Sequence, residues 1–281
     1  MAETGTLYLV GTPIGNLADV SQRALDVLRQ VQVIACEDTR RTRILLDKHG
    51  IGTRTISMPA FDEARRAGGI VERLSGGDSV ALVTDAGMPG ISDPGSEVVR
   101  LAVEAGVPVV PVPGPSAPLA ALAASGLPTD RFTFFGFLPR KGGARRDAMA
   151  ELLAAPGTLL LFESPRRLHE TLLGLREALG DRRACVAREL TKLHEEFVRG
   201  RLSELAERFS GEVLGEITIV VEGRSGPAPA AQQADPDELL RARLAAGASV
   251  RDASREVAEA LGLPRKALYQ RALELASEPG R

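Results

Sequence analysis

Apolar and polar positions alternate in blocks along the first 125 residues. Short apolar runs, rich in β-branched residues, occur at "VQVIAC" (31–36), "SVALVT" (79–84) and "VPVVPV" (107–112). Runs that are apolar on both faces are typical of parallel strands covered on both sides. Between them, stretches such as "ALDVLRQV" (24–31) repeat apolar residues every three or four positions, which predicts helices with one buried face. The pattern therefore predicts an α/β domain built on a parallel sheet.

The stretch "LPTDRFTFFGFLPRKGGARR" (127–146) breaks this rhythm and predicts the crossing into a second domain. It holds four of the chain's eight phenylalanines ahead of a basic segment. Alternating phenylalanines in an apolar stretch are more often core than base-stacking residues, so we expect them to be buried. The runs "GTLLLFES" (157–164), "RACVAREL" (183–190) and "GEITIVVEG" (215–223) predict a second mixed α/β domain, with fewer long covered strands than the first.

A Pro-, Ala- and Gln-rich segment, "RSGPAPAAQQADP" (224–236), predicts a linker before a helical C-terminus. There "SVRDASREVAEALGLPRKALYQRALEL" has a helix–Gly-Leu-Pro–helix form that resembles a helix-turn-helix. Either nucleic-acid contact or simple packing would explain that form. The predicted organisation is an N-terminal α/β domain (1–126), a second α/β domain (127–223), the linker (224–236) and a helical module (237–281).

Composition and charge narrow the class of protein. The chain is 44% hydrophobic and 26% charged with a formal net charge of −2, which is typical of a soluble globular protein without a global positive field. No run approaches the length of a membrane span, and the start lacks the features of a signal peptide. We expect Cys36 and Cys185 to be buried reduced thiols, and the three histidines show no metal-ligand spacing. A cytoplasmic protein without a metal site is expected.

Three glycine- and proline-rich loops each follow a predicted strand: "GTPIGN" (11–16), "TDAGMPGISDPG" (84–95) and "PVPGPSA" (111–117). Loops after the carboxyl ends of parallel strands gather at one sheet edge, where ligands bind. The first loop lacks the Gly-Lys-Ser/Thr of a P-loop and the three glycines of a dinucleotide fingerprint, and Pro13 removes one amide donor. Together the loops predict a pocket for adenosine and a cationic group; the alternative is three structural turns.

Seven motifs carry a resemblance to a known family: "LYLVGTPIGNLAD", "IACEDTRRTRILL", "ALVTDAGMPGISDPG", "PVPGPSA", "GLPTDRFTFFGFLPRK", "VARELTK" and "GEITIVVEG". In this order they resemble the tetrapyrrole-methylase-like (class III) methyltransferases, and within them the enzymes that methylate a cytidine 2′-oxygen in small-subunit ribosomal RNA. The resemblance covers residues 6–223 and is weaker in the C-terminal helices. "EDTR" and "GFLPRK" separate the RNA enzymes from the porphyrin-ring methylases.

The resemblance implies two α/β domains with a cleft for S-adenosylmethionine between them, plus the small helical module. It also implies a cytidine in the decoding centre of 16S ribosomal RNA as acceptor, the 30S subunit as partner, and a homodimer. The implied cofactor contacts are Pro13, Ile14, Asp85, Gly87, Met88, Ile91, Ser116, Ala117, Phe162, Ala187 and Thr218.

A ribose hydroxyl is a weak nucleophile at neutral pH, so a positioned base would help. The candidates are Glu37 and Asp38, with Glu63 behind them; the alternative is a plain helix start capped by Asp38. RNA binding requires local positive charge. The candidates, which could also be ordinary solvated surface, are Arg40, Arg140, Lys141, Arg145, Arg146, Arg166, Arg167 and Lys266.

Two departures from the family pattern limit what is carried over. A His-Asn-Glu run is usual where this chain has Phe61, Asp62 and Glu63, and a tyrosine is common in place of Phe162. A role for that imidazole or phenol is therefore not expected here. Two rival functions stay open: a methyltransferase acting on a tetrapyrrole, and a non-catalytic regulator that binds nucleic acid through the C-terminal helices.

Overall fold

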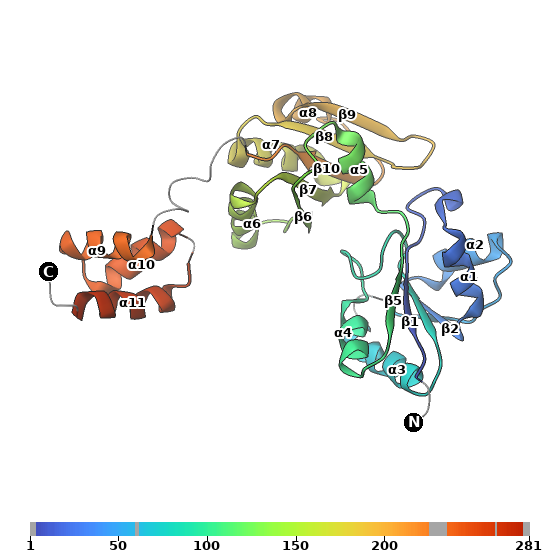
Figure 1. The fold of residues 1–281 in the computed structure, drawn as a ribbon. Coiled ribbons are helices and arrows are strands. Elements are labelled where there is room, and N and C mark those ends of the chain that lie inside the picture. The colour runs from blue at the N-terminus through green and yellow to red at the C-terminus, as the bar shows by residue number, and fades with distance from the viewer. Residues whose placement is uncertain (1–3, 60–61, 225–234, 262, 278–281) are drawn as a thin grey trace. The chain divides into compact units, whose positions relative to one another are not determined.

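The computed structural model describes residues 4–59, 62–224, 235–261 and 263–277, and Figure 1 shows its fold as a ribbon. The chain divides into two compact units, one ending at Arg224 and one beginning at Ser225. The first unit contains two separate five-stranded sheets. The division of this unit into domains at residue 126 stays a prediction.

The first sheet has the strand order β3-β2-β4-β1-β5, and all its strand pairs are parallel. Its strands are β1 (Leu7–Val10), β2 (Val33–Cys36), β3 (Thr55–Ser57), β4 (Val80–Val83) and β5 (Val109–Val112). Its helices are α1 (Gln22–Gln30), α2 (Thr39–Lys48), α3 (Glu63–Ser75) and α4 (Ser96–Glu104), with a short 3₁₀ helix, η1 (Leu17–Asp19).

Alternation along the strands explains how the helices cover this sheet. Ile34 and Cys36 of β2 pack with α1 and α2, whereas Val33 and Ala35 pack with α3 and α4 on the other face. Figure 1 shows the two helix pairs on opposite sides of the sheet. Both faces of the central strands β2 and β4 are buried, which is why their sequences are apolar throughout, whereas the edge strand β3 (Thr-Ile-Ser) is only partly buried.

The second sheet has the order β6-β7-β10-β8-β9; β6 runs parallel to β7, and the remaining pairs are antiparallel. Its strands are β6 (Phe132–Phe137), β7 (Thr158–Glu163), β8 (Arg183–Arg188), β9 (Glu196–Arg201) and β10 (Ile217–Val221). Its helices are α5 (Ala117–Ser125), α6 (Gly143–Ala154), α7 (Leu168–Leu179) and α8 (Leu202–Arg208), with the 3₁₀ helix η3 (Pro165–Arg167).

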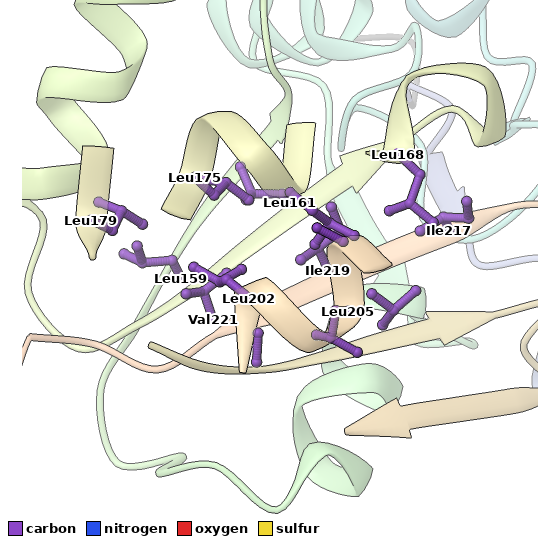
Figure 2. Close-up of a cluster of buried hydrophobic side chains, with 14 of the residues drawn as sticks. Leu159, Leu161, Leu168, Leu175, Leu179, Leu202, Leu205, Ile217, Ile219 and Val221 are labelled. Carbon is purple, nitrogen blue, oxygen red and sulfur yellow. The ribbon is translucent and has the colours of Figure 1, made fainter. Parts of the chain in front are cut away.

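Two apolar layers cover the second sheet. Leucines of α6, α7 and α8 pack with Leu159, Leu161 and Ile219 on one face, as Figure 2 shows for α7 and α8. Helix α5 packs on the other face with Leu160 and Val220. The expectation of fewer long covered strands here was wrong: β7, β8 and β10 are longer than the strands of the first sheet and mostly buried, because helices cover both faces. Both cysteines are buried and free, as predicted, and burial raises the pKa of each thiol.

The second unit contains α9 (Pro236–Ala245), α10 (Val250–Leu261) and α11 (Arg265–Ser277). Its core includes Leu240, Val257 and Leu268, one from each helix. Arg271 Nε donates to the Asp237 carboxylate at 2.9 Å, so this arginine joins α11 to α9. The predicted linker lies mostly outside the described residues. None of the described helices is long and apolar enough to cross a membrane.

The separation into two units generates a stability prediction. A chain truncated after Arg224 should unfold cooperatively in urea with a midpoint close to that of the full chain, because both sheets and their cores lie before that residue. Circular dichroism with urea titration measures this. A truncated chain that is insoluble, or that unfolds without cooperativity, would show that the first unit depends on the C-terminal helices.

Candidate active site

Close backbone contacts join the three glycine–proline loops into one wall. The Thr12 N–H donates to the Gly87 carbonyl at 2.9 Å, and the Gly87 N–H donates back to the Thr12 carbonyl at 3.1 Å. The Thr12 hydroxyl donates to the Thr84 carbonyl at 3.1 Å. A Cβ on Gly114 would lie only 2.7 Å from the Gly11 carbonyl carbon and oxygen, so a side chain there would force the two loops apart.

A cavity of about 760 Å³ opens beside this wall and is lined from both halves of the first unit. From the loops, Ile14 reaches across and packs with Leu160 and Val220 of the second sheet. Gly15 fits closely against the loop after β8, where a Cβ would come within 2.6 Å of Lys192 Cγ. The first loop therefore forms part of the cavity and also joins it to the second sheet.

Most of the predicted cofactor residues meet in this cavity. Those that line it are Ile14, Gly87, Met88, Ile91, Ser116, Ala117, Phe162 and Thr218. Three others are not among the lining residues: Pro13, Asp85 and Ala187. Ser116 occupies the N-cap position of α5, but its side chain makes no capping hydrogen bond. Its hydroxyl is thus available at the cavity wall.

The structure adds lining residues that the sequence did not single out. These include Ser92, Asp93, Leu119, Phe132, Phe134, Phe137, Glu163, Leu190 and Glu216. Asp93 lies in the glycine- and proline-rich loop 84–95, so its place after a predicted strand could have indicated a cavity residue. Glu163 stands at the end of a buried strand, where a carboxylate is unusual.

The spacing of the phenylalanines of β6 predicted that they belong to the core, and for Phe132 and Phe137 this prediction was wrong. Phe132 and Phe137 are 42% and 56% exposed and line the cavity. At Phe137 the cause is local: Gly136 has φ +62°, and the pairing of β6 with β7 shifts register between Phe134 and Phe137. Phe162 lies 5.1 Å from Phe134 and 5.4 Å from Phe137 between ring centroids, which makes an aromatic wall.

Asp85 organises the loop after β2 instead of lining the cavity. Its carboxylate accepts the Asp38 N–H at 3.2 Å and pairs with Arg41 at 3.2 Å. In return, the Asp85 backbone donates a hydrogen bond to the Glu37 carboxylate. Burial and the negative charge of Asp85 raise the pKa of Glu37, and this hydrogen bond lowers it. The net pKa of Glu37 is raised.

The other two predicted catalytic carboxylates make local bonds. Asp38 is the N-cap of α2, and hydrogen bonds from the Arg40 side chain and backbone lower its pKa to about 2. Glu63 accepts the N–H groups of Gly95 and Glu97, both at 2.9 Å, and so holds the start of α4. Neither residue lines the cavity. Phe61, at one of the departures from the family pattern, lies outside the described residues.

Asp93 differs from these carboxylates because it faces the cavity. Burial raises its pKa to about 6, with smaller contributions from the negative charges of Glu37 and Asp85. The preceding residue, Ser92, has φ +64°, a strained conformation for a non-glycine residue. The other two described non-glycine residues with positive φ, Glu189 and Thr191, flank the lining residue Leu190. Backbone strain is thus concentrated at the cavity.

The predicted basic residues fall into two groups. Arg145 donates to the Pro139 carbonyl at 3.2 Å, and Arg167 donates to the Leu138 carbonyl at 3.1 Å and pairs with the buried Glu163 at 2.6 Å. Both arginines therefore hold the segment after β6 in place. The second group consists of exposed residues that form no ion pair with the described part of the chain: Arg140, Lys141, Arg146 and Arg166. Arg40 pairs with Asp38, and Lys266 is exposed on α11.

The charge distribution limits what the cavity can hold. Among the described residues that line it, Asp93, Glu163 and Glu216 are acidic and none is Lys, Arg or His. The remaining wall is mostly aliphatic, aromatic or Gly/Pro backbone. Such a site disfavours a phosphate and suits a flat heteroaromatic group joined to a positive charge.

Comparison with known proteins agrees with this fold. A family model described as Tetrapyrrole (Corrin/Porphyrin) Methylases matches residues 6–206, and one described as RsmI C-terminal HTH domain matches residues 230–276. The structure of uroporphyrin-III C-methyl transferase from Thermus thermophilus complexed with S-adenosyl homocysteine has the same fold, with a TM-score of 0.56 at 22% identity. That match covers 77% of this chain and 97% of the other.

Similar sequences carry a more specific description. Ribosomal RNA small subunit methyltransferase I of Mesorhizobium japonicum is 48% identical over 98% of this chain and 93% of its own length. The protein of that description from Thermotoga maritima is 47% identical over 78% of this chain and 99% of its own length. The chain therefore belongs to the tetrapyrrole methylases, and among them to the ribosomal RNA small subunit methyltransferase I family.

The two neighbouring arginines of η3 give a test of the internal bonding. Arg167→Leu should lower the free energy of unfolding by about 3 kcal/mol, because it leaves the buried Glu163 carboxylate without its charge partner. The matched control Arg166→Leu removes an exposed arginine and should change the free energy by less than about 0.5 kcal/mol. Urea unfolding of both variants measures the difference. Equal effects would mean that the Glu163–Arg167 pair does not stabilise the fold.

Proposed function

We propose that this chain transfers a methyl group from S-adenosylmethionine to the ribose 2′-oxygen of a cytidine in 16S ribosomal RNA. The observation that carries the proposal is the near-full-length identity to ribosomal RNA small subunit methyltransferase I, combined with a cavity of matching chemistry. S-adenosylmethionine supplies an electrophilic methyl group on a positively charged sulfur. The acidic, cation-free lining suits that charge, and the Gly/Pro loops offer backbone surface to an adenosine.

The donor is held by the wall of three loops and the facing strands. Ile14, Met88 and Ala117 contribute apolar contacts, while Ser116 and Thr218 contribute hydroxyls. The remaining lining residues of the predicted set, Gly87, Ile91 and Phe162, complete this surface. Pro13, Asp85 and Ala187 support it from behind, since Asp85 fixes the neighbouring loop and Ala187 is buried in the apolar layer that holds Ile14.

The acceptor RNA is held by the exposed basic residues that follow β6 and β7. Arg140, Lys141 and Arg146 contact phosphates together with Arg166, whereas Arg145 and Arg167 act indirectly by holding this segment in shape. The exposed ring of Phe137 at the cavity stacks on an unpaired base. Arg40 and Lys266 provide further phosphate contacts from other parts of the chain.

The predicted catalytic carboxylates fulfil positioning roles in this proposal. Asp38 starts α2, and with a pKa of about 2 it is a weak base. Glu63 holds the start of α4 next to the "ISDPG" loop. Glu37 accepts a hydrogen bond from the Asp85 backbone and so anchors the loop after β4. The negative charge of Glu37 also contributes to the raised pKa of Asp93.

The working partner is the 30S subunit or its precursor in the cytoplasm, and the enzyme acts as a homodimer. The described surface includes Leu193 and Leu214, which are 92% and 69% exposed, so apolar groups are available for contact with a second copy.

The T. maritima relative shows that a protein of this description can be shorter by about a fifth of this chain.

Methyl transfer to defined 30S particles tests the proposal. The purified protein, labelled S-adenosylmethionine and 30S particles from cells lacking the endogenous enzyme should yield one 2′-O-methylcytidine in 16S RNA, mapped by nuclease digestion and mass spectrometry. Heat-denatured protein is the control. Donor binding without RNA methylation would contradict the proposed acceptor and favour a tetrapyrrole, and absence of donor binding would contradict an enzyme of this class.

The basic residues generate a second prediction. Arg140→Glu/Arg166→Glu should weaken affinity for an RNA fragment about tenfold and lower the salt dependence of binding, since each phosphate contact contributes about 0.7 to that slope. The control Lys48→Glu/Arg54→Glu reverses two exposed cations elsewhere on the first sheet. Filter binding across salt concentrations measures both variants, and donor affinity should be unchanged. Equal behaviour of the two variants would remove Arg140 and Arg166 from the RNA contact.

A further inference from the structure

Arg224, at the end of the first unit, carries a positive charge for which the described residues provide no partner. Its side chain is half-buried, and two of its guanidinium nitrogens, Nε and Nη1, are shielded from solvent and make no hydrogen bond. Shielding an unpaired cation from water costs free energy, so such groups normally meet a carboxylate or another anion. Arg224 therefore needs an anionic partner that the described part of the chain does not supply.

A second arginine lies close to Arg224. Arg182 Nε donates to the Leu179 carbonyl at 2.9 Å, and its Nη1 donates to the Glu222 carbonyl at 3.4 Å. Burial lowers the pKa of Arg182, and the positive charge of Arg224 lowers it further, so the two guanidinium groups lie within electrostatic reach of each other. The Glu222 carboxylate offsets part of this effect, but it pairs with Arg183 at 3.7 Å. Two like charges are thus brought together with little compensation.

Arg131 reaches the same place through two closely packed glycines. A Cβ on Gly223 would collide with the Gly157 backbone, and a Cβ on Gly157 would lie 2.8 Å from Arg131 Cγ. Glycine at both positions therefore lets the Arg131 side chain approach the segment that carries Arg224. Arg131 is exposed and forms no ion pair with the described residues. Together, Arg131, Arg182 and Arg224 form an arginine cluster.

The arginine cluster lies at the other end of β10 from the cavity. Ile217 and Thr218, at the start of β10, line the cavity, whereas the strand ends at Val221, three residues before Arg224. No member of the cluster is among the lining residues of the cavity. Guanidinium groups bind phosphate oxygens through paired N–H donors. The composition of the cluster thus fits a phosphate group and not a positively charged donor.

We propose that the arginine cluster is a second anion site, in which Arg224 binds a phosphate group with Arg182 and Arg131 beside it. The inference rests on the proposed function, in which this phosphate belongs to the backbone of the acceptor RNA. The phosphate oxygens accept hydrogen bonds from the Arg224 guanidinium and neutralise charges that otherwise repel one another. The enzyme then holds its RNA at two separate places, after β6 and β7 and at the arginine cluster, which favours a large structured RNA as substrate.

Urea unfolding of the free protein tests whether Arg224 is kept for binding. Arg224→Met keeps the length and the apolar stem of the side chain but removes the unpaired charge, so the unfolding midpoint in chloride should equal or exceed that of the wild type. The matched control Arg54→Met alters an exposed arginine just before β3 and should leave the midpoint unchanged. A clearly lower midpoint for Arg224→Met would mean that Arg224 stabilises the fold, and would overturn the inference.

Inorganic phosphate probes the site directly. When phosphate replaces chloride at constant ionic strength, the wild-type midpoint should rise along a saturating curve, because a bound anion stabilises the folded state by mass action. Phosphate also stabilises folded proteins through its exclusion from their surface, and this effect should be the same in all variants. Arg54→Met should keep the saturating part of the response, and Arg224→Met should lose it. Equal responses of the two variants would overturn the anion site.

Binding to a 16S RNA fragment identifies the source of the phosphate. Arg224→Met should weaken RNA affinity about five- to tenfold and lower the salt slope by about 0.7, whereas Arg54→Met should bind like the wild type. Affinity for S-adenosylhomocysteine reports on the cavity and should stay within about twofold in both variants. A lost phosphate response with unchanged RNA affinity would overturn the assignment to RNA and identify a site for free phosphate.

The phosphate response does not require methyl transfer, so the anion site and the proposed function fail separately. If the wild type methylates 30S particles but Arg224→Met and Arg54→Met behave alike with phosphate and with RNA, the anion site is overturned and the function stands. If the wild type methylates no RNA while the phosphate response depends on Arg224, the anion site stands and the proposed function fails.

Discussion

The site depends on the contact between backbones at the carboxyl edge of the first sheet. Gly11 and Gly114 approach so closely that neither has room for a Cβ, and Thr12 and Gly87 exchange two hydrogen bonds. These contacts hold loops from β1, β4 and β5 at fixed separations. This arrangement fixes the position of the loop residues that line the cavity, so this wall of the cavity is set by backbone rather than by adjustable side chains.

Charge is arranged differently inside and outside the cavity. Carboxylates line the inside or stand just behind it, whereas cations that form no ion pair with the described residues lie exposed after β6 and β7. A cationic ligand and a polyanionic ligand would therefore meet opposite potentials within one unit of the chain. The nearly neutral net charge of the protein conceals this separation, which depends on where Glu163 and Asp93 are placed relative to Arg140 and Arg166.

Much of this organisation could be predicted from the sequence. Apolar runs predict the strands, and the Gly/Pro loops predict which sheet edge borders the cavity, because both signals depend on local chemistry. The role of each charged residue could not be predicted in the same way. Arg166 and Arg167 are adjacent and identical, yet only Arg167 reaches Glu163. This difference depends on the direction in which η3, just before α7, points each side chain. Asp93 likewise becomes distinctive only because the folded chain leaves it unpartnered in the cavity.

The phenylalanines of β6 show a similar limit. Their spacing is typical of core, but the register shift and the left-handed Gly136 turn Phe137 toward the cavity. The same distortion has a second effect, because β6 is the outermost strand of its sheet. A regular edge strand presents a row of free backbone groups on which another protein chain can pair, and a bulge interrupts that row. The irregularity that shapes the cavity therefore also makes this edge a poor template for aggregation.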